Sequence, residues 1–346
     1  MKIILDGMGG DHAPDAIVEG AVQAAGMLKD ADEICITGPE ALIREKLSKY
    51  GYRGHKITIC DAQSVITNDE APVMAVRSKK DSSIVKGLRM VKEGDGDVFI
   101  SAGSTGALLA GGLLILGRVR GIDRPTLATV YPVLGSDQPS LLTDAGANAE
   151  CKPRNLFEFG VMGSIYMEKV MNRPNPTVGL VNLGTEKEKG TPLTKAARAL
   201  LEDSDLNFIG NIETRELQNA VCDVIVTDGF TGNACIKLTE GLGISMLKIA
   251  KSMFMSSPKT KFAALMMKDQ LAGLKAQLDY KEYGGAPILG LQKALLKMHG
   301  SSDALAVRQT ILKAVPYVEE GVVETIAQAL GDRARSIEED EEKERQ

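Results

Sequence analysis

The stretch "KIILDGMGGDHAP", Lys2–Pro14, contains the pattern that decides the fold of this 346-residue chain. Its apolar, β-branched start predicts a buried strand, and the glycines that follow predict a tight turn before a helix. The same order recurs, for example at "DVFISAGSTG" (Asp97–Gly106) and "DVIVTDGFTGN" (Asp223–Asn233). We therefore expect an α/β fold of three layers, in which a mostly parallel sheet carries helices on both faces.

The composition narrows the classes of function. The chain has 41 Lys and Arg against 46 Asp and Glu, so its net charge of −5 gives no reason to expect nucleic acid as a partner. The N-terminus is too polar for a signal peptide, and no segment approaches the roughly 18 apolar residues of a membrane span. The five cysteines form no CxxC pair, and no spacing of His or carboxylates indicates a metal site. We therefore expect a cytosolic protein without a metal or cofactor.

The chain contains no low-complexity linker, so we expect residues 1–335 to form a single α/β domain. The segment Ser245–Lys275 differs from the rest because it has six lysines and one acidic residue. Apolar residues recur there at helical spacing on both sides of Pro258, which predicts a helical hairpin at about 240–280. The charge run at 336–346 predicts a flexible acidic tail.

Polar turns follow several of the predicted strands. The first turn lacks a dinucleotide fingerprint, since His12 stands where the third glycine would be, but a bare turn before a helix still attracts an anion. If the turns converge at the carboxyl ends of the strands, they form a pocket rich in donors for phosphate or a carbonyl oxygen. Helix capping is the alternative, and it is the better explanation for each hydroxyl residue taken alone. The candidate residues are Gly9, Gly10, Asp11, Ser104, Thr105, Asn148, Thr185, Thr231 and Asn233.

Two residues beside these turns can supply charge or a proton. His12 can orient phosphate or protonate a leaving group, with Asp11 or Asp6 fixing its tautomer, and a turn histidine bonded to local backbone is the equal alternative. Lys189 follows "NLGTE" closely enough to reach an anion at the strand end, whereas Lys187 is better explained as a solvated loop residue.

Two basic surfaces are predicted outside the pocket. Arg77, Lys79 and Lys80 lie on a probable helix, which is either a solvated face or a landing patch for an acidic partner. In the hairpin, methionines and phenylalanines alternate with lysines, a combination that favours an interfacial helix or a cradle for an acyl chain over a core helix. The residues of the hairpin that we expect to contact a membrane or partner are Lys251, Met253, Phe254 and Lys261.

Eight blocks, taken together and in order, carry a resemblance to a known family. The chain resembles the bacterial phosphate acyltransferases of phospholipid synthesis, the acyl-acyl carrier protein:phosphate acyltransferases, from Lys2 to about Ala329. The blocks are "DGMGGDHAP", "ISAGSTGALLAGGLLILGRVRGIDRP", "DAGANAECKP", "FGVMGSIY", "NLGTEKEKG", "VTDGFTGNACIKLTEG", "YGGAPILG" and "HGSSDALAV".

The resemblance implies transfer of a long fatty acyl group from acyl carrier protein to inorganic phosphate. It also implies a homodimer with a Rossmann-like fold akin to phosphotransacetylases and isocitrate dehydrogenases, peripherally associated with the cytoplasmic membrane. The acyl phosphate would pass to a membrane glycerol-3-phosphate acyltransferase. With this activity, phosphate is assigned to the Gly9, Gly10 and Ser104 turns with Lys189 neutralising its charge, and the carbonyl oxygen to Asn233, Thr231 or Asn148.

Three other functions fit parts of the sequence. A short-chain acyl-coenzyme A:phosphate acyltransferase would use the same turns. A nicotinamide dehydrogenase is less favoured because the chain lacks the glycine fingerprint and a metal-carboxylate cluster. A non-catalytic membrane scaffold would explain the hairpin and leave the polar turns unused.

Overall fold

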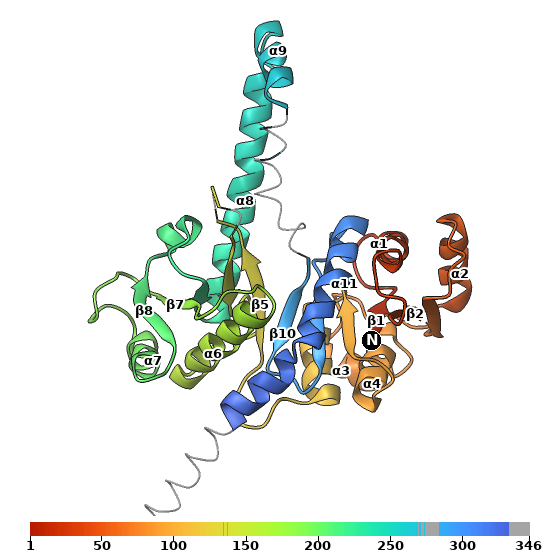
Figure 1. Ribbon diagram of the computed structural model, residues 1–346, viewed down its shortest axis with the longest axis horizontal. Coiled ribbons are helices and arrows are strands. Elements are labelled where there is room, and N and C mark those ends of the chain that lie inside the picture. Colours follow the sequence, from red (N-terminus) through yellow and green to blue (C-terminus); the bar gives the residue numbers. More distant parts are fainter. Residues whose placement is uncertain (134, 137, 269, 271–272, 274–283, 332–346) are drawn as a thin grey trace, which may run out of the picture.

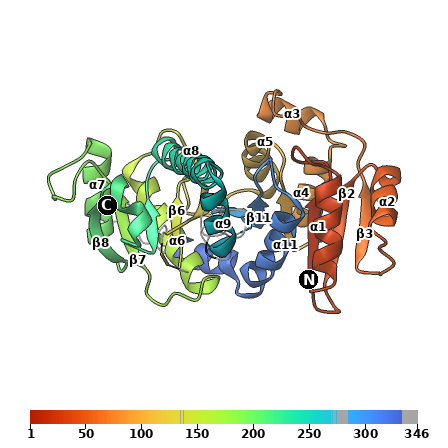
Figure 2. The same ribbon diagram turned by 90° about the horizontal axis from the view of Figure 1, so that it is seen from above.

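A computed structural model describes the chain except for residues 134, 137, 269, 271–272, 274–283 and 332–346. Eleven strands form one sheet in the order β3-β2-β1-β4-β11-β10-β5-β6-β9-β7-β8, and helices cover both of its faces (Figures 1 and 2). The predicted α/β class is therefore confirmed. The strands are β1 (Lys2–Asp6), β2 (Glu33–Gly38), β3 (Ile57–Asp61), β4 (Val98–Ser101), β5 (Thr126–Tyr131), β6 (Ser140–Thr143), β7 (Thr177–Val181), β8 (Asn207–Ile212), β9 (Val224–Val226), β10 (Ala286–Leu289) and β11 (Ala294–Lys297).

The helices alternate with the strands along most of the chain. Two short segments have other geometries: a π-helical turn at Gly112–Leu116 and a 3₁₀ turn at Thr214–Asn219. The α-helices are α1 (Asp15–Ala25), α2 (Glu40–Lys49), α3 (Pro72–Ser78), α4 (Ser83–Glu93), α5 (Thr105–Gly111), α6 (Pro153–Lys169), α7 (Pro192–Glu202), α8 (Gly229–Phe254), α9 (Pro258–Met266) and α11 (Ala304–Glu319).

The sheet consists of two parallel sections joined by antiparallel strands. β3, β2, β1, β4 and β11 are mutually parallel, and so are β6, β9, β7 and β8. Between them, β10 runs antiparallel to β11 and to β5, and β5 runs antiparallel to β6. Three reversals of direction mean that the two sections run in opposite directions. Their polar turns therefore do not all share one edge of the sheet, as a uniformly parallel sheet would require.

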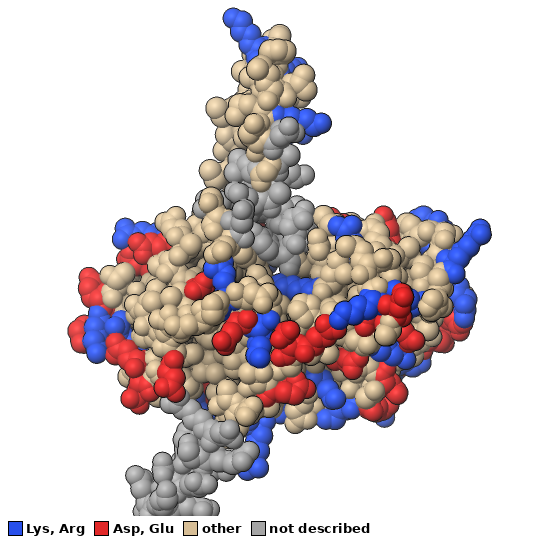
Figure 3. All heavy atoms as spheres, in the orientation of Figure 1, with Lys and Arg blue, Asp and Glu red and all other residues tan. Residues whose placement is uncertain are grey.

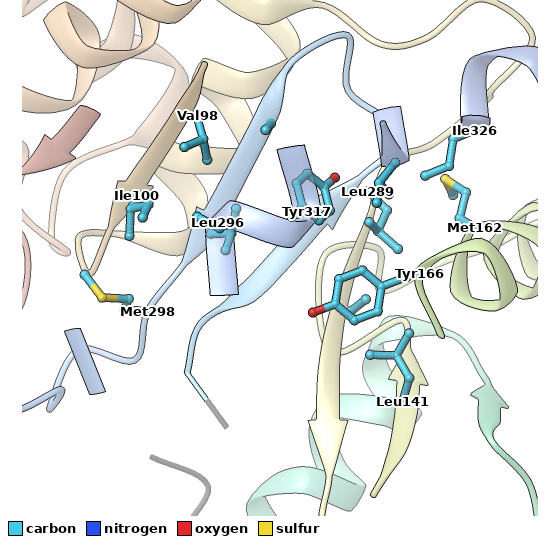
Figure 4. Close-up of a cluster of buried hydrophobic side chains, with 14 of the residues drawn as sticks. Val98, Ile100, Leu141, Met162, Tyr166, Leu289, Leu296, Met298, Tyr317 and Ile326 are labelled. Atoms are coloured by element: carbon cyan, nitrogen blue, oxygen red, sulfur yellow. The ribbon is translucent and has the colours of Figure 1, made fainter. Parts of the chain in front are cut away.

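One buried apolar cluster spans both sections (Figure 4). Ile100 and Leu296 come from the first section and Leu141 from the second, and all three are almost completely buried. Tyr166 of α6 faces Tyr317 of α11, with 6.1 Å between the ring centroids. Burial of each such side chain stabilises the fold by about 1.5–3 kcal/mol. The joint between the sections is thus packed as a continuous core.

The predicted break near Pro258 is confirmed. α8 projects from the body and ends at Phe254, and α9 begins at Pro258, where the Ser257 side chain accepts the backbone N–H of Thr260 (Figure 1). The rest of the hairpin predicted at 240–280 lies mostly outside the described residues from Leu271 onward. The acidic tail predicted at 336–346 lies wholly outside them. In the described part of the chain, every helix is too short or too polar to span a membrane.

Candidate active site

A pocket of about 540 Å³ lies where the two sections of the sheet meet below α8. We call it the central pocket. The ends of β4 and β11 provide one wall, β5 provides another, and the first turns of α8 close it. Its polar lining includes Asp11, Thr105, Asn233, Lys237, Lys297 and His299, and its apolar lining includes Leu127, Val130, Tyr131 and Ile236.

The turn after β1 is packed too tightly for any residue but glycine. A Cβ on Gly9 would lie 2.5 Å from Asp6 Oδ2 and from the backbone nitrogen of Gly103. Gly10 has φ +96°, and a Cβ there would lie 2.9 Å from the carbonyl oxygen of Gly300. Both glycines therefore bring the β1 turn against the turns after β4 and β11, and Asp11 is the residue of this turn that lines the central pocket.

Asp6 holds the base of that turn. Its buried carboxylate accepts the hydroxyl of Ser101 at 2.6 Å and the backbone N–H of Met8 at 3.1 Å. Burial raises the pKa of the Asp6 carboxyl. His12 instead is exposed and lines a separate shallow depression with Asp15, Glu19 and Asp303. The structure therefore does not bring His12 to the central pocket.

The two hydroxyl residues at the start of α5, Ser104 and Thr105, have different roles. Ser104 is buried, and its Oγ accepts the backbone N–H of Ala107 at 3.4 Å as the helix N-cap. Capping, the alternative considered for Ser104, is thus what the structure has. Thr105 lines the central pocket and remains available for a ligand.

The loop after β6 is organised by one buried carboxylate. Asp144 accepts backbone N–H groups from Leu127, Gly146, Ala147 and Asn148 at 2.6–3.2 Å, and also the side-chain amide of Asn148 at 2.9 Å. Burial raises the pKa of the Asp144 carboxyl, and these donors act in the opposite direction. The Asn148 amide also donates to the carbonyl oxygen of Pro125 at 2.8 Å, so it points into the loop. Gly146 faces the pocket in its place.

The N-terminus of α8 separates two pockets. Asp228 caps the helix by accepting the backbone N–H and the hydroxyl of Thr231, both at 2.9 Å. Both residues line a second pocket of about 500 Å³ with Asn182 and Thr194, which we call the side pocket. Asn233, two residues further along α8, lies beside Gly146 on the central pocket.

The loop after β7 does not reach the central pocket. Thr185 and Lys189 are exposed, and among the described residues that line the central and side pockets neither is present. Lys187 pairs with Glu202 at 3.1 Å, as a loop lysine of the surface would. The structure thus brings together Asp11, Thr105 and Asn233 of the predicted residues, and separates them from His12, Thr185 and Lys189.

Three basic residues of the central pocket were missed or given little weight from the sequence. Burial lowers the pKa of Lys297 to about 8, against the opposing effect of Asp6 and Asp11. Burial also lowers the pKa of His299, whose Nδ1 lies 2.8 Å from the Ser301 hydroxyl. Lys237 reaches the same pocket from α8. The available signal was a lysine at the last position of the apolar run "ALLK", immediately before the histidine block.

Of the three basic residues predicted to lie on one helix, only Arg77 does, because α3 ends at Ser78 and Lys79 and Lys80 follow it. Lys79 lies 2.7 Å from the Glu70 carboxylate and donates to the carbonyl oxygen of Val65, so it has a structural role, whereas Arg77 and Lys80 are exposed. In the hairpin, Phe254 is half-buried at the end of α8. The other predicted contact residues of the hairpin, Lys251, Met253 and Lys261, are exposed.

Comparisons with known proteins agree with this architecture. Residues 1–325 match the model of the family described as "Fatty acid synthesis protein". A phosphate acyltransferase from Alkaliphilus oremlandii is 52% identical over 96% of this chain and 99% of that protein. A phosphate acyltransferase from Clostridium novyi is 48% identical over 94% of this chain and 97% of that protein.

Two solved structures show the same fold at low sequence identity. A phosphotransacetylase from Streptococcus pyogenes has a TM-score of 0.61 at 18% identity and covers 93% of this chain and 94% of that one. A branched-chain phosphotransacylase from Enterococcus faecalis has a TM-score of 0.56 at 12% identity, covering 92% of this chain and 99% of that one. On the family match and the two close relatives, the chain belongs to the phosphate acyltransferase family and is an acyltransferase.

Proposed function

We propose that this protein transfers a long-chain fatty acyl group from acyl carrier protein to inorganic phosphate, and that the acyl phosphate serves phospholipid synthesis. The observation that carries the proposal is the central pocket, whose polar and basic lining lies directly below a long helix with an apolar exposed surface. A small anion and a long acyl chain can therefore be held side by side. Membership of the phosphate acyltransferase family supports the reaction type.

The chemistry requires positioning more than activation. Hydrogen phosphate is already an anionic nucleophile, and a thiolate with a pKa of about 8.5 leaves readily. An oxygen of phosphate forms a bond to the thioester carbonyl carbon, the carbon–sulfur bond breaks, and the departing thiolate takes the proton that hydrogen phosphate loses. The protein has to hold both reactants and stabilise the intermediate oxyanion with fixed donors.

Three of the predicted residues fit this site best. The Asn233 amide supplies N–H donors for the carbonyl oxygen, and the Thr105 hydroxyl supplies one for phosphate. Asp11 lines the same pocket and limits where the phosphate anion can sit. Ser104, Asn148 and Thr231 contribute through the loops that they cap or brace. The predicted roles of His12, Lys189 and Thr185 would require movement of their loops toward the central pocket.

The surface around the pocket supports a carrier protein, a membrane and a second copy as partners. Between Gly241 and Lys268 the hairpin has five lysines and no acidic residue, and its surface is otherwise uncharged (Figure 3). Its exposed side chains include Leu242, Met246 and Phe262. Such a surface suits anionic lipid, so we infer peripheral membrane binding beside the glycerol-3-phosphate acyltransferase that would consume the product. At the end of α3, the exposed Arg77, together with the exposed Lys80 just beyond the helix, suits the acidic carrier protein. The apolar stripe Leu238, Leu242, Met246 and Ile249 suits a homodimer contact.

The test is phosphate-dependent consumption of a thioester. Purified protein is incubated with palmitoyl-acyl carrier protein with and without inorganic phosphate, and acyl phosphate is trapped as hydroxamate. We expect product only with phosphate, and a strong loss in Asn233→Ala. Lys189→Ala is the second variant, because wild-type turnover in it would remove Lys189 from the reaction.

The same assay separates the alternatives. Faster turnover of acetyl-coenzyme A than of palmitoyl carrier thioester would replace the proposal by a short-chain acyltransferase. Vesicle binding without phosphate-dependent consumption of either thioester would leave only the membrane scaffold.

A further inference from the structure

Lys297 occupies a central position in the fold. It is the last residue of β11, where its backbone pairs with Ser101 at the end of β4 and with Ala286 at the start of β10. Its side chain is half-buried and lines the central pocket, and its Nζ donates to the carbonyl oxygen of Met298. A lysine in the middle of an eleven-stranded sheet is costly to keep charged, so its presence there needs a reason.

Neither of the nearby carboxylates, Asp6 and Asp11, forms a hydrogen bond or ion pair with Lys297 among the described contacts. Asp6 is bonded to Ser101 and Met8, and it acts on Lys297 only through its field, as does Asp11 on the rim of the pocket. Among the ion pairs of the described residues, none includes Lys297. Lysines of the surface such as Lys46 and Lys86 each lie against an aspartate instead.

A second and a third basic group face the same space. His299, two residues after Lys297, is influenced by the positive charges of Lys297 and Lys237, and by the negative charges of Glu240 and Asp11. Lys237 and Glu240 come from α8 and also line the pocket. The pocket therefore gathers two ammonium groups from opposite walls around a space that His299 borders.

We propose that Lys297, assisted by Lys237, holds the inorganic phosphate in the central pocket. This inference rests on the proposed phosphate-dependent acyl transfer and names the cation that the reaction requires. A doubly charged phosphate beside the two ammonium groups places an oxygen next to the Asn233 wall, where the thioester carbonyl would lie. Lys297 keeps its proton throughout, because the proton lost by hydrogen phosphate goes to the thiolate.

The decisive variant is Lys297→Met, which removes the charge and keeps a similar length. Its matched control is Lys293→Met, just before the same strand, and Lys297→Arg retains a charge. At pH 7 we expect the KM for phosphate to rise about 10-fold to 100-fold in Lys297→Met, the range for losing a charged hydrogen bond, with the KM for the carrier thioester unchanged. Lys293→Met should match the wild type, and Lys297→Arg should lie nearer to it than Lys297→Met.

The pH dependence provides a second readout. Because the pKa of Lys297 is about 8, the wild-type KM for phosphate should rise between pH 7 and 9 as the ammonium loses its proton, and Lys297→Met should lack that rise. Folding is checked by thermal unfolding at pH 7. The folded-state pKa lies below the ordinary value of 10.5, so the charged form costs stability below about pH 8, and Lys297→Met should be at least as stable as the wild type.

Binding of inorganic phosphate alone separates this inference from the proposed function. If phosphate raises the melting temperature of the wild type and not of Lys297→Met while no thioester is consumed, the binding site stands and the reaction falls. If acyl phosphate forms and Lys297→Met retains its KM for phosphate within twofold, the reaction stands and Lys297 is not its phosphate ligand. A parallel rise of both KM values in Lys297→Met would also overturn the inference.

Discussion

The base and the shaft of α8 belong to one continuous helix and meet opposite surroundings. In the base, up to Glu240, Gly229 and Gly232 are buried against the loop after β6, and Asn233 and Lys237 line the central pocket. In the shaft, from Gly241 to Phe254, side chains such as Met246 and Met253 are about two-thirds exposed. The helical period is the same in both parts. What a residue of α8 does therefore depends on its distance from the sheet and, in the base, also on the face of the helix that it occupies, since Leu238 is exposed there.

The largest effect is expected at the base, for Gly232→Ala. The added Cβ would lie 1.9 Å from the carbonyl oxygen of Asp144, and that loop cannot move away without losing the hydrogen bonds that Asp144 accepts. We expect a loss of about 3 kcal/mol or more in the free energy of unfolding, measured in urea. An unchanged midpoint would mean that the base of α8 is not fixed against this loop.

The next effect tests the loop itself. Asp144→Ala leaves the backbone N–H groups of Leu127, Ala147 and Asn148 buried without their acceptor, and we expect a loss of about 3 kcal/mol. Asp144→Asn keeps one oxygen and should lose less. Asp228→Ala, which removes only the cap of α8, is the control and should cost about 1 kcal/mol. Equal losses in Asp144→Ala and Asp228→Ala would contradict the role given to Asp144.

Substitutions on the shaft of α8 and on α9 should change membrane binding and leave the stability of the fold unchanged. Met253→Glu combined with Phe262→Glu places charge on side chains that are 65% and 64% exposed. We expect the free energy of unfolding to be unchanged and binding to anionic vesicles to weaken at least about tenfold, as loss of a buried apolar side chain implies. Phe254 is avoided because it is half-buried. Met27→Glu, equally exposed on the body, is the control, and a similar loss of vesicle binding there would contradict a membrane role for the hairpin.

The sequence predicts the elements of this fold better than their directions. Strand–turn–helix units at Lys2–Pro14 and Asp223–Asn233 were recognisable because period and turn chemistry are local properties. The reversal through β10 and β5 was not, because strand direction depends on pairing between residues far apart in the chain. That reversal does not separate Asn233 from Lys189, because the strands before them, β9 and β7, are parallel neighbours in one section. Asn233 lines the central pocket from the strand nearer to β5, and Lys189 follows the strand one position farther out.

The residues of the central pocket were also hard to predict, because they come together from distant parts of the chain. The strand "ALLK" is too short to show a hydrophobic period. No local feature of the sequence indicates that Lys297 lies near enough to feel the charge of Asp6, or that it lines the same pocket as the base of α8. The hydrogen bonds to Asp144 likewise come from two elements, the start of β5 at Leu127 and the loop after β6. Ser104 could be recognised as a cap, because a cap depends only on its own helix, whereas Thr231 donates to the cap of α8, Asp228.

The smallest effect is expected in the shaft, for Gly241→Ala. Among the described residues outside the helix backbone, no atom lies within 4 Å of the added Cβ. Alanine favours a helix over glycine by about 0.5–1 kcal/mol, so the shaft should become more stable by that amount. Slower amide hydrogen exchange between Gly241 and Phe254, compared with the wild type, is the measurement. A loss of stability would mean that another surface approaches the helix closely at this glycine. Since a homodimer is proposed along the adjacent stripe of Leu238 and Leu242, that loss of stability should then depend on protein concentration. If no loss of stability occurs at any concentration, the shaft is free to contact lipid or carrier protein.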